Sequence, residues 1–226
     1  ALTAQNNDAN NYNTAVGYIA GASVTTGTQN TLIGGLTGDA LTTGALNVAV
    51  GYGSLTSDDL GSKSVAIGHS TLANQNYATA TDSFNTAVGH SAGSAVSTGV
   101  KNTLIGGTTG QGLTTGGENV AVGYGALYTD DLGSHNVAVG VSALQNQNFA
   151  TATDSHNTAV GFSAGLSITT GQNNVVIGGL AGDALTAVND NVVVGTGALT
   201  SDTLGSGTVA IGRQVLQTQN FTTATT

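Results

Sequence analysis

The sequence predicts an all-β fold, a parallel β-solenoid in which the chain winds through twelve coils. The first observation is a five-residue phrase of the form N/S/T-x-A/L/V-V/I-G, which occurs twelve times in 226 residues. The second is its spacing: the interval between closing glycines is 17 three times and then 21, and this order recurs. Fixed periods of this length are typical of units that stack on their neighbours. The closing glycines are Gly17, Gly34, Gly51, Gly68, Gly89, Gly106, Gly123, Gly140, Gly161, Gly178, Gly195 and Gly212.

Three short coils and one long coil form a super-repeat, which gives the sequence a second period of 72. The three super-repeats cover 13–84, 85–156 and 157–226, and we expect 13–226 to be a single solenoid domain. Residues 1–12 resemble the end of a preceding coil or a cap. The chain starts without Met, which suggests a processed product or a piece of a longer protein.

Each phrase is expected to form a short strand, because Val, Ile and Thr favour β-structure and the glycines would break a helix. Each coil should carry two or three such strands, paired in parallel with the coils on either side. Gly at the fifth position indicates a positive φ or a close backbone approach. Asn holds the first position except where Ser64 and Thr208 replace it, and its amides should form a hydrogen-bonded ladder with steps of about 4.8 Å.

Side chains along a strand alternate between its two faces. We expect positions two and four of the phrase, such as Val65 and Ile67, to face the inside of the coil. Position three then faces outward, although it is never polar; Leu32, Leu104 and Val176 occupy it in the second coil of each super-repeat. An apolar outer face is expected to be covered by sister chains around a symmetry axis. The alternative is a single-chain solenoid that leaves small alanines exposed.

Composition excludes several classes of function. Charged residues make up 7% of the chain, the net charge is −9, and the basic residues are Lys63, Lys101 and Arg213. Nucleic acids and anionic membrane surfaces need more cations than this. No apolar run is long enough to span a bilayer, and the absence of Cys excludes disulfides.

Two segments, SVAIGHSTL at 64–72 and TVAIGRQVL at 208–216, resemble the β-roll heads of trimeric autotransporter adhesins. The phrases NTAVGYIAG, NTLIGG and TTG are similar to repeats of phage-type tail-fibre proteins. The resemblance implies a left-handed β-roll, a homotrimer and a place at a cell or virion surface. It also implies that Val65, Ile67, Val209 and Ile211 point inward. The coil of this chain is longer than the usual unit of the adhesin heads.

The four histidines occupy no common column of the super-repeats, so we assign no catalytic, cofactor-binding or metal-binding residue. The tripeptide DSH at 154–156 holds the residue types of a catalytic triad, but neighbours on an extended segment diverge. Aligned super-repeats place His135 with Lys63 and Gly207, His156 with Tyr12 and Phe84, His69 with Val141 and Arg213, and His90 with Tyr18 and Phe162.

Carboxylate pairs recur at Asp58–Asp59 and Asp130–Asp131, and Asp202 keeps one carboxylate in the third copy. We expect solvated turns there, with calcium binding as the alternative. The aromatic residues at 77, 149 and 221 lie in the longer coil. They are expected to pack over its four extra residues, or else to stack on sugar rings.

The sequence therefore favours a non-enzymatic shaft or adhesin segment of a trimeric, extracellular surface fibre. Its partners would be two sister chains and a glycan or protein receptor, with no cofactor and no membrane insertion. The alternative is a filament subunit that stacks end to end. An ice-binding solenoid would use its TT pairs, and a polysaccharide-acting β-helix enzyme would need convergent carboxylates. Both are less favoured. The TT pairs do not occur in every coil, and no acid or base recurs together with the partner residues that catalysis would need.

Overall fold

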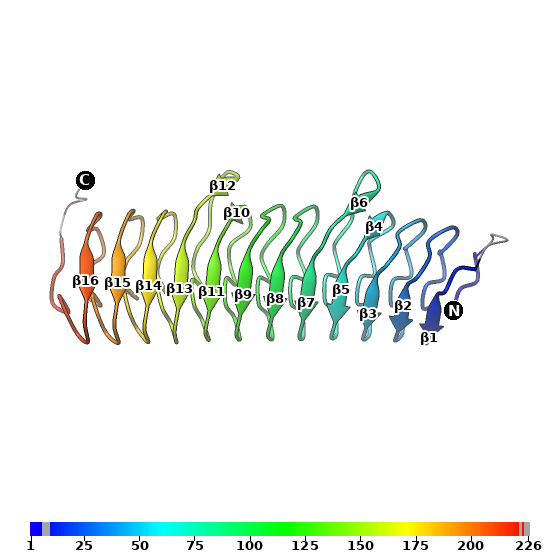
Figure 1. The fold of residues 1–226 in the computed structure, drawn as a ribbon, viewed down its shortest axis with the longest axis horizontal. Coiled ribbons are helices and arrows are strands. Elements are labelled where there is room, and N and C mark those ends of the chain that lie inside the picture. The colour runs from blue at the N-terminus through cyan, green and yellow to red at the C-terminus, as the bar shows by residue number, and fades with distance from the viewer. Residues whose placement is uncertain (6–9, 222, 224–226) are drawn as a thin grey trace.

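The computed structural model describes residues 1–5, 10–221 and 223. The described chain is a parallel β-solenoid without a helix, a straight rod in which one coil follows another (Figure 1). Each coil contributes one three-residue strand to a 12-stranded sheet. The strands are β1 Thr14–Val16, β2 Thr31–Ile33, β3 Val48–Val50, β5 Val65–Ile67, β7 Thr86–Val88, β8 Thr103–Ile105, β9 Val120–Val122, β11 Val137–Val139, β13 Thr158–Val160, β14 Val175–Ile177, β15 Val192–Val194 and β16 Val209–Ile211.

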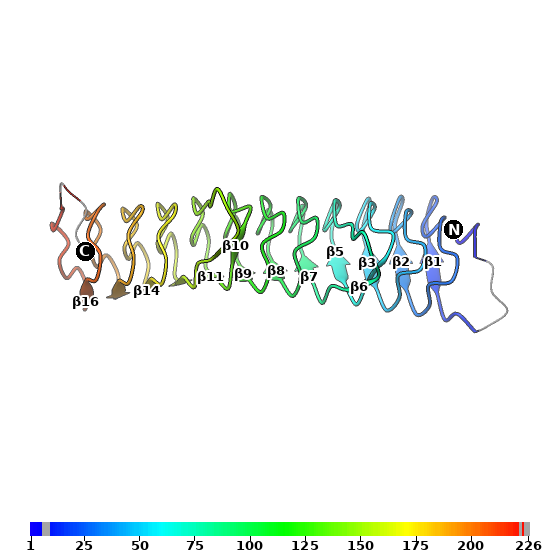
Figure 2. The same ribbon diagram turned by 90° about the horizontal axis from the view of Figure 1, so that it is seen from above.

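All strands of this sheet run parallel, and their register follows the glycine spacing of the sequence. Ile33 pairs with Val50 across a short coil, and Ile67 pairs with Val88 across a long coil. The four extra residues therefore extend a corner and leave the strand register intact. The first two long coils each carry a further small sheet that protrudes from the rod (Figure 1), and the view from above in Figure 2 shows the row of stacked coils. These sheets pair β4 (Gly61–Ser62) with β6 (Thr81–Asp82) and β10 (Gly133–Ser134) with β12 (Thr153–Asp154).

Two expected boundaries fall partly on residues that the structure does not describe. The cap or coil end expected at 1–12 includes residues 6–9, and the third super-repeat includes 222 and 224–226. Within the described part of the first segment, Leu2 N–H donates a hydrogen bond to Ala20 O at 3.1 Å, and Ala4 N–H donates one to Ala22 O at 3.1 Å. Residues 1–5 therefore lie against the first coil.

Most coils have one strand, so the expectation of two or three strands per coil was wrong. The rest of each coil contains too many turns to form further extended strands. Non-glycine residues adopt left-handed φ at these corners, including Leu127 at 52° and Thr108 at 55°. Backbone hydrogen bonds between equivalent corners of adjacent coils stabilise these conformations. Thr108 N–H donates to His90 O at 2.8 Å, and Leu127 N–H donates to Ala143 O at 3.0 Å. Stacking of equivalent corners thus replaces additional strands.

The closing glycines are required by both backbone conformation and space, as the sequence predicts. Gly106 has a φ of 137°, which side chains rarely tolerate. A Cβ on Gly106 would also lie 2.5 Å from the carbonyl oxygen of Gly123 in the next coil. Consecutive coils can therefore stack at this corner only when the residue is glycine.

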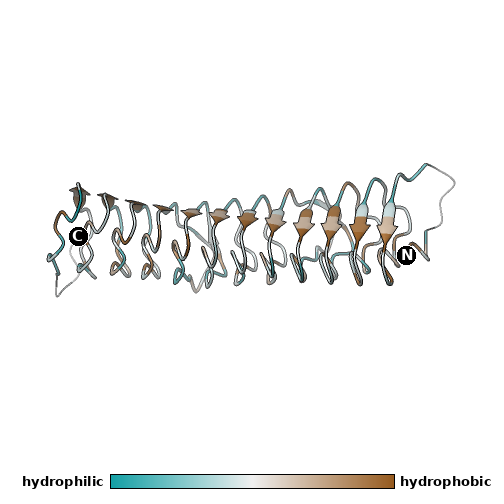
Figure 3. Ribbon diagram, turned by 90° about the horizontal axis from the view of Figure 1, so that it is seen from below, coloured by the Kyte–Doolittle hydropathy of each residue, from teal (hydrophilic) through white to brown (hydrophobic). Residues whose placement is uncertain are grey.

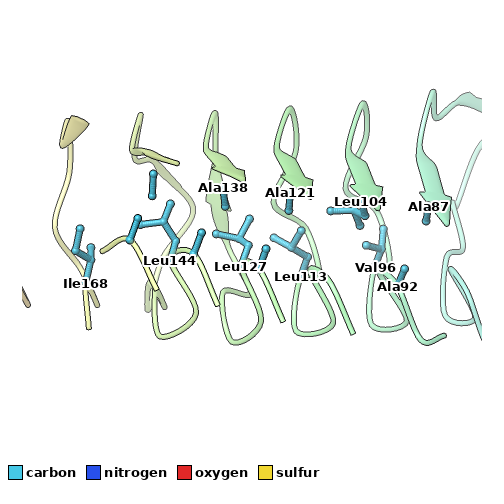
Figure 4. Close-up of a cluster of buried hydrophobic side chains, with 14 of the residues drawn as sticks. Ala87, Ala92, Val96, Leu104, Leu113, Ala121, Leu127, Ala138, Leu144 and Ile168 are labelled. Carbon is cyan, nitrogen blue, oxygen red and sulfur yellow. The ribbon is translucent and has the colours of Figure 1, made fainter. Parts of the chain in front are cut away.

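The inside of the coil is lined by position three of the phrase, so the predicted orientation of the strands was wrong. Leu104, Ala121 and Ala138 are fully buried, and Figure 4 shows them pointing towards Leu113 and Leu127 of the opposite wall. Positions two and four face outward. The four residues that the adhesin resemblance places inside follow the same rule: the exposed fractions of Ile67, Val209 and Ile211 are 37%, 65% and 65%, and Val65 is half-buried.

The physical reason for this orientation is the narrow interior. Large leucines from the opposite wall fill it, and mostly Ala fits against them. Where position three carries Leu104, glycines in the surrounding wall leave room for the larger side chain. A Cβ on Gly93 would lie 2.6 Å from Leu104 Cδ1, and a Cβ on Gly110 would lie 2.8 Å from Leu104 Cδ2. The first super-repeat has the same fit around Leu32. These residues are plugs inside one coil, so they cannot form the interface between chains that the sequence predicted.

The Asn column is buried and forms the predicted ladder. Asn119 Oδ1 accepts a hydrogen bond from the backbone N–H of Asn136 at 2.9 Å, and the Asn119 amide donates to Gly133 O at 2.9 Å. The backbone N–H of Asn119 donates to Asn102 Oδ1 at 3.0 Å. Most rungs join a backbone N–H to a side-chain oxygen, whereas bonds between two amides are fewer, as between Asn136 and Asn119 at 3.1 Å. The ladder thereby satisfies backbone groups that would otherwise be buried without a partner.

Candidate functional surface

The main candidate surface is the outer face of the 12-stranded sheet, formed by the first and third residue of each strand. Of these 24 positions, 19 hold Val or Ile and five hold Thr, so none is charged. Their side chains are half-buried or exposed, with exposed fractions of 41% for Ile105 and 39% for Ile177. Figure 3 shows the strands as a row of apolar residues along one side of the rod. In a sheet with one solvated face, the residues on that face are normally polar. The outer strand face is apolar, so it resembles a surface that another molecule covers.

A row of rings borders the outer strand face at the residue two places after each strand. Because alternate residues share a face, this row continues the outward surface. Tyr52 and His69 stack with ring centroids 5.5 Å apart, and His69 and His90 stack at 5.3 Å. The exposed aromatic and imidazole rings of this row belong to Tyr18, Tyr52, His69, His90, Tyr124 and Phe162.

The opposite border, two residues before each strand, carries charged groups. Lys101 Nζ lies 2.8 Å from Glu118 Oε1, and His135 Nε2 lies 3.2 Å from Glu118 Oε2. The hydrogen bond from Lys101 is the largest influence that lowers the pKa of Glu118 below its usual value. Lys63 pairs with Asp82 at 2.6 Å. Each of these two lysines thus forms an exposed ion pair with a carboxylate of the next coil.

The structure exposes all four histidines and brings His135 and His156 together. They lie one long coil apart, with ring centroids 5.1 Å apart, and Asp154 lies beside both. Comparison of the super-repeats did not reveal this group. It matched equivalent positions of different super-repeats, whereas these residues lie in adjacent coils of the same super-repeat. Within the tripeptide DSH, Ser155 is fully buried, whereas Asp154 and His156 are exposed. The three residues therefore do not form a triad.

The acidic turns are only partly solvated, so the expectation was wrong for the first carboxylate of each pair, whereas Asp59 and Asp131 are half-buried. Asp58 and Asp130 are fully buried. Asp130 accepts hydrogen bonds from Gly133 N–H at 3.1 Å and from Gln147 Nε2 at 2.7 Å, so both of its oxygens are used. Burial is the largest influence on both groups and raises the pKa of the Asp58 and Asp130 carboxyls above the usual value. These donors occupy the two Asp130 oxygens that calcium would require, whereas the buried Oδ1 atoms of Asp59 and Asp131 have no hydrogen-bond partner.

The aromatic residues of the first two long coils pack inward and are buried. Tyr77 and Phe149 are 5% and 4% exposed, and Tyr77 donates a hydrogen bond to Gly99 O at 2.9 Å. This supports the expected packing role and leaves neither ring available to a sugar. Phe221 is more open, with an exposed fraction of 38%.

Comparison with known protein families, curated proteins and solved structures finds no significant match to this chain. Among the described residues there is no helix long and apolar enough to cross a bilayer.

Proposed function

We propose that this chain is a non-enzymatic rod segment of a trimeric surface fibre, in which three copies pack through their outer strand faces. The observation that carries the proposal is the continuous row of outward Val and Ile on twelve parallel strands. The left-handed winding and the location outside the cell, on a cell or virion surface, rest on the resemblance of the phrase to adhesin heads and tail-fibre repeats.

The periodicity of the outer strand face favours copies of the same chain as its cover. Its rows repeat at about 4.8 Å. A second copy has the same rise, so its side chains interdigitate with these rows along the whole length, whereas a partner with another period loses register. The uncharged character of this face also matters. Each chain has a net charge of −9, and an uncharged face lets the chains meet without bringing carboxylates together.

The size of the surface is consistent with such an assembly. Twelve strands span roughly 53 Å, and three residues give a strip roughly 10 Å wide, so the footprint is about 500 Å². Standard interfaces bury about 800 Å² on each partner. The ring row and the charged row widen the strip on either side. In a trimer every chain would contact two neighbours, so both borders would be used.

The alternatives receive less support from the side-chain contacts. An ice-binding surface needs a regular array of free threonine hydroxyls. Thr42 and Thr114 donate theirs to Asp59 O and Asp131 O in the next coil at 3.0 and 3.1 Å, and the exposed row of Thr43 and Thr115 is interrupted by leucine in the coils that follow. A polysaccharide-cleaving site needs a convergent acid and base, and the fully buried carboxylates, Asp58, Asp130 and Asp202, are sealed from solvent.

Sedimentation equilibrium tests the proposal directly. We expect a particle of three times the 22.0 kDa of one chain. Ile105→Asp would place three carboxylates inside the assembly, where unpaired charge costs several kcal/mol per group. This variant should sediment as a folded monomer, with an unchanged circular dichroism spectrum.

Thr151→Asp is the matched control, because it adds the same charge at an exposed tip of the long coil. It should remain trimeric. A parent chain that sediments as a monomer would refute the trimer, and unlimited growth of the particle would favour the end-to-end filament. An Ile105→Asp variant that remains trimeric would show that another surface holds the copies together.

A further inference from the structure

The corner of the second long coil gathers metal-ligating side chains from two adjacent turns. β10 pairs with β12 so that Ser134 lies opposite Asp154. His135 follows β10 directly, His156 lies two residues after Asp154, and all three side chains are exposed. One potential ligand atom from each of His135, Asp154 and His156 lies within 4.8 Å of the others. The pairing of the two turns, and not chance proximity of long side chains, sets this arrangement.

Glu118 holds the imidazole of His135 in a suitable orientation. His135 Nε2 faces Glu118 Oε2 at 3.2 Å, whereas Nδ1 faces Asp154 Oδ1 at 3.1 Å. A carboxylate on one ring nitrogen leaves the other nitrogen to bind a metal, and such pairs orient and strengthen histidine ligands. Glu118 is itself fixed by Lys101 from the coil before it.

We propose that His135, Asp154 and His156 bind one divalent transition-metal ion, of which Zn²⁺ is the representative. Two imidazoles and one carboxylate match the ligand preference of Zn²⁺, whereas Ca²⁺ and Mg²⁺ prefer sites built from oxygen alone. Tetrahedral bonds of about 2.0–2.2 Å place ligand atoms about 3.4 Å apart. Because these side chains are exposed, rotation can close their ligand atoms to this separation, and solvent completes the coordination.

The first long coil shows what the same corner does without histidines. Lys63 stands in place of His135, pairs with Asp82 at 2.6 Å, and lies 5.0 Å from the centroid of Phe84. The ammonium group of Lys63 thus occupies the position beside the Asp82 carboxylate. In the second long coil the lysine and the phenylalanine are replaced by His135 and His156. The carboxylate of that coil therefore faces two metal ligands where Asp82 faces an ammonium group.

Isothermal titration of the chelator-treated protein with ZnCl₂ tests the proposal. At about pH 7.5 we expect one Zn²⁺ per chain. His135→Lys combined with His156→Phe reproduces the side chains of the first long coil, so this variant should fold. Its affinity for Zn²⁺ should fall by at least about 100-fold.

Two further variants separate this corner from other zinc binding. Glu118→Leu copies Leu46 of the first super-repeat and should weaken binding by about 10–100-fold through the loss of the orienting carboxylate. His69→Val combined with His90→Phe removes the other stacked histidine pair, using the residues found at 141 and 162, and should leave binding unchanged.

Three outcomes would overturn the site: no heat above dilution for the parent chain, equal affinity in the variant that carries Lys and Phe at the corner, or loss of binding in the variant that lacks His69 and His90. Circular dichroism of each variant shows whether it is folded. Because all three ligands come from one chain, the same titration of the folded, monomeric Ile105→Asp variant tests this site separately from the formation of trimers.

Discussion

The two faces of most strands differ in the size of their side chains more than in their polarity. In β9, Ala121 is fully buried, while Val120 beside it has an exposed fraction of 37%. Next to the strand, Asn119 is polar and fully buried. The bulky β-branched residues thus lie outside, and mostly small apolar residues and amides lie inside. In this solenoid, burial follows the narrow cross-section of the coil and the pairing of polar groups, so hydrophobicity alone does not identify the core.

The largest expected effect separates the inner and the outer face at adjacent residues. Leu104→Asp would bury an unpaired carboxylate against Leu113 and empty the space that Gly93 and Gly110 leave for the leucine. Loss of a buried leucine costs about 2–5 kcal/mol, and burial of the charge adds to this. We expect the chain to fail to fold or to lose most of its cooperative unfolding transition by circular dichroism.

Ile105→Asp is the matched comparison, because it introduces the same group one residue later on the outer face. Because Ile105 is 41% exposed, this variant should keep the circular dichroism spectrum and the cooperative unfolding transition that Leu104→Asp loses. Equal destabilisation by the two variants would contradict the assignment of the two faces.

A smaller effect is expected from the buried amides. Asn119→Ala leaves Gly133 O and the N–H of Asn136 without their partners. Each of these two unsatisfied buried groups costs about 1–3 kcal/mol, so urea unfolding should show a loss of about 2–6 kcal/mol. Asn119→Ser keeps a hydroxyl, as Ser64 does in its coil, and should recover part of this loss. If alanine were neutral here, the ladder would not contribute to stability.

The buried carboxylates predict a pH dependence that the outer face lacks. Burial raises the pKa of Asp130, so the folded chain binds this proton more tightly than the unfolded chain. The associated stability is complete below the unfolded pKa of about 3.9 and is lost as the pH rises through the folded pKa. The urea midpoint of Asp130→Asn should therefore change less than that of the parent between about pH 4 and pH 7.

Val120→Thr is the control for this titration, because it changes an outer-face residue of the same super-repeat and leaves every carboxylate in place. Its profile should match that of the parent. A parent midpoint that does not fall over this range, or an Asp130→Asn profile identical to it, would contradict the stated effect of burial.

The smallest effect is expected on the outer face. Val120→Thr introduces the residue that Thr103 already provides at the paired position of the preceding strand. The free energy of unfolding of the monomeric chain should change by less than about 0.5 kcal/mol, which thermal denaturation of the folded Ile105→Asp background can measure. A larger loss would show that the outer face contributes to the stability of a single coil.

Some features could be predicted from the sequence because they repeat along it. The glycine spacing predicts parallel coils, the register across both coil lengths, the positive φ of Gly106 and the Asn ladder. The solvated state of Asp58 and Asp130 was mispredicted, because their burial depends on Gln75 and Gln147, which reach them from the following coil. The group of His135, Asp154 and His156 was missed, because its members meet through the pairing of β10 with β12.

The sequence by itself determined the period of this protein and the stacking of equivalent residues, since similar coils place equivalent residues one above another. The alternation of side chains also follows from the sequence, because it is a property of any extended segment. Which of the two apolar faces turns inward was decided only by the tertiary structure. That choice depends on the volume left by the leucines of the opposite wall, such as Leu113 and Leu127, and this volume exists only once the coil has closed.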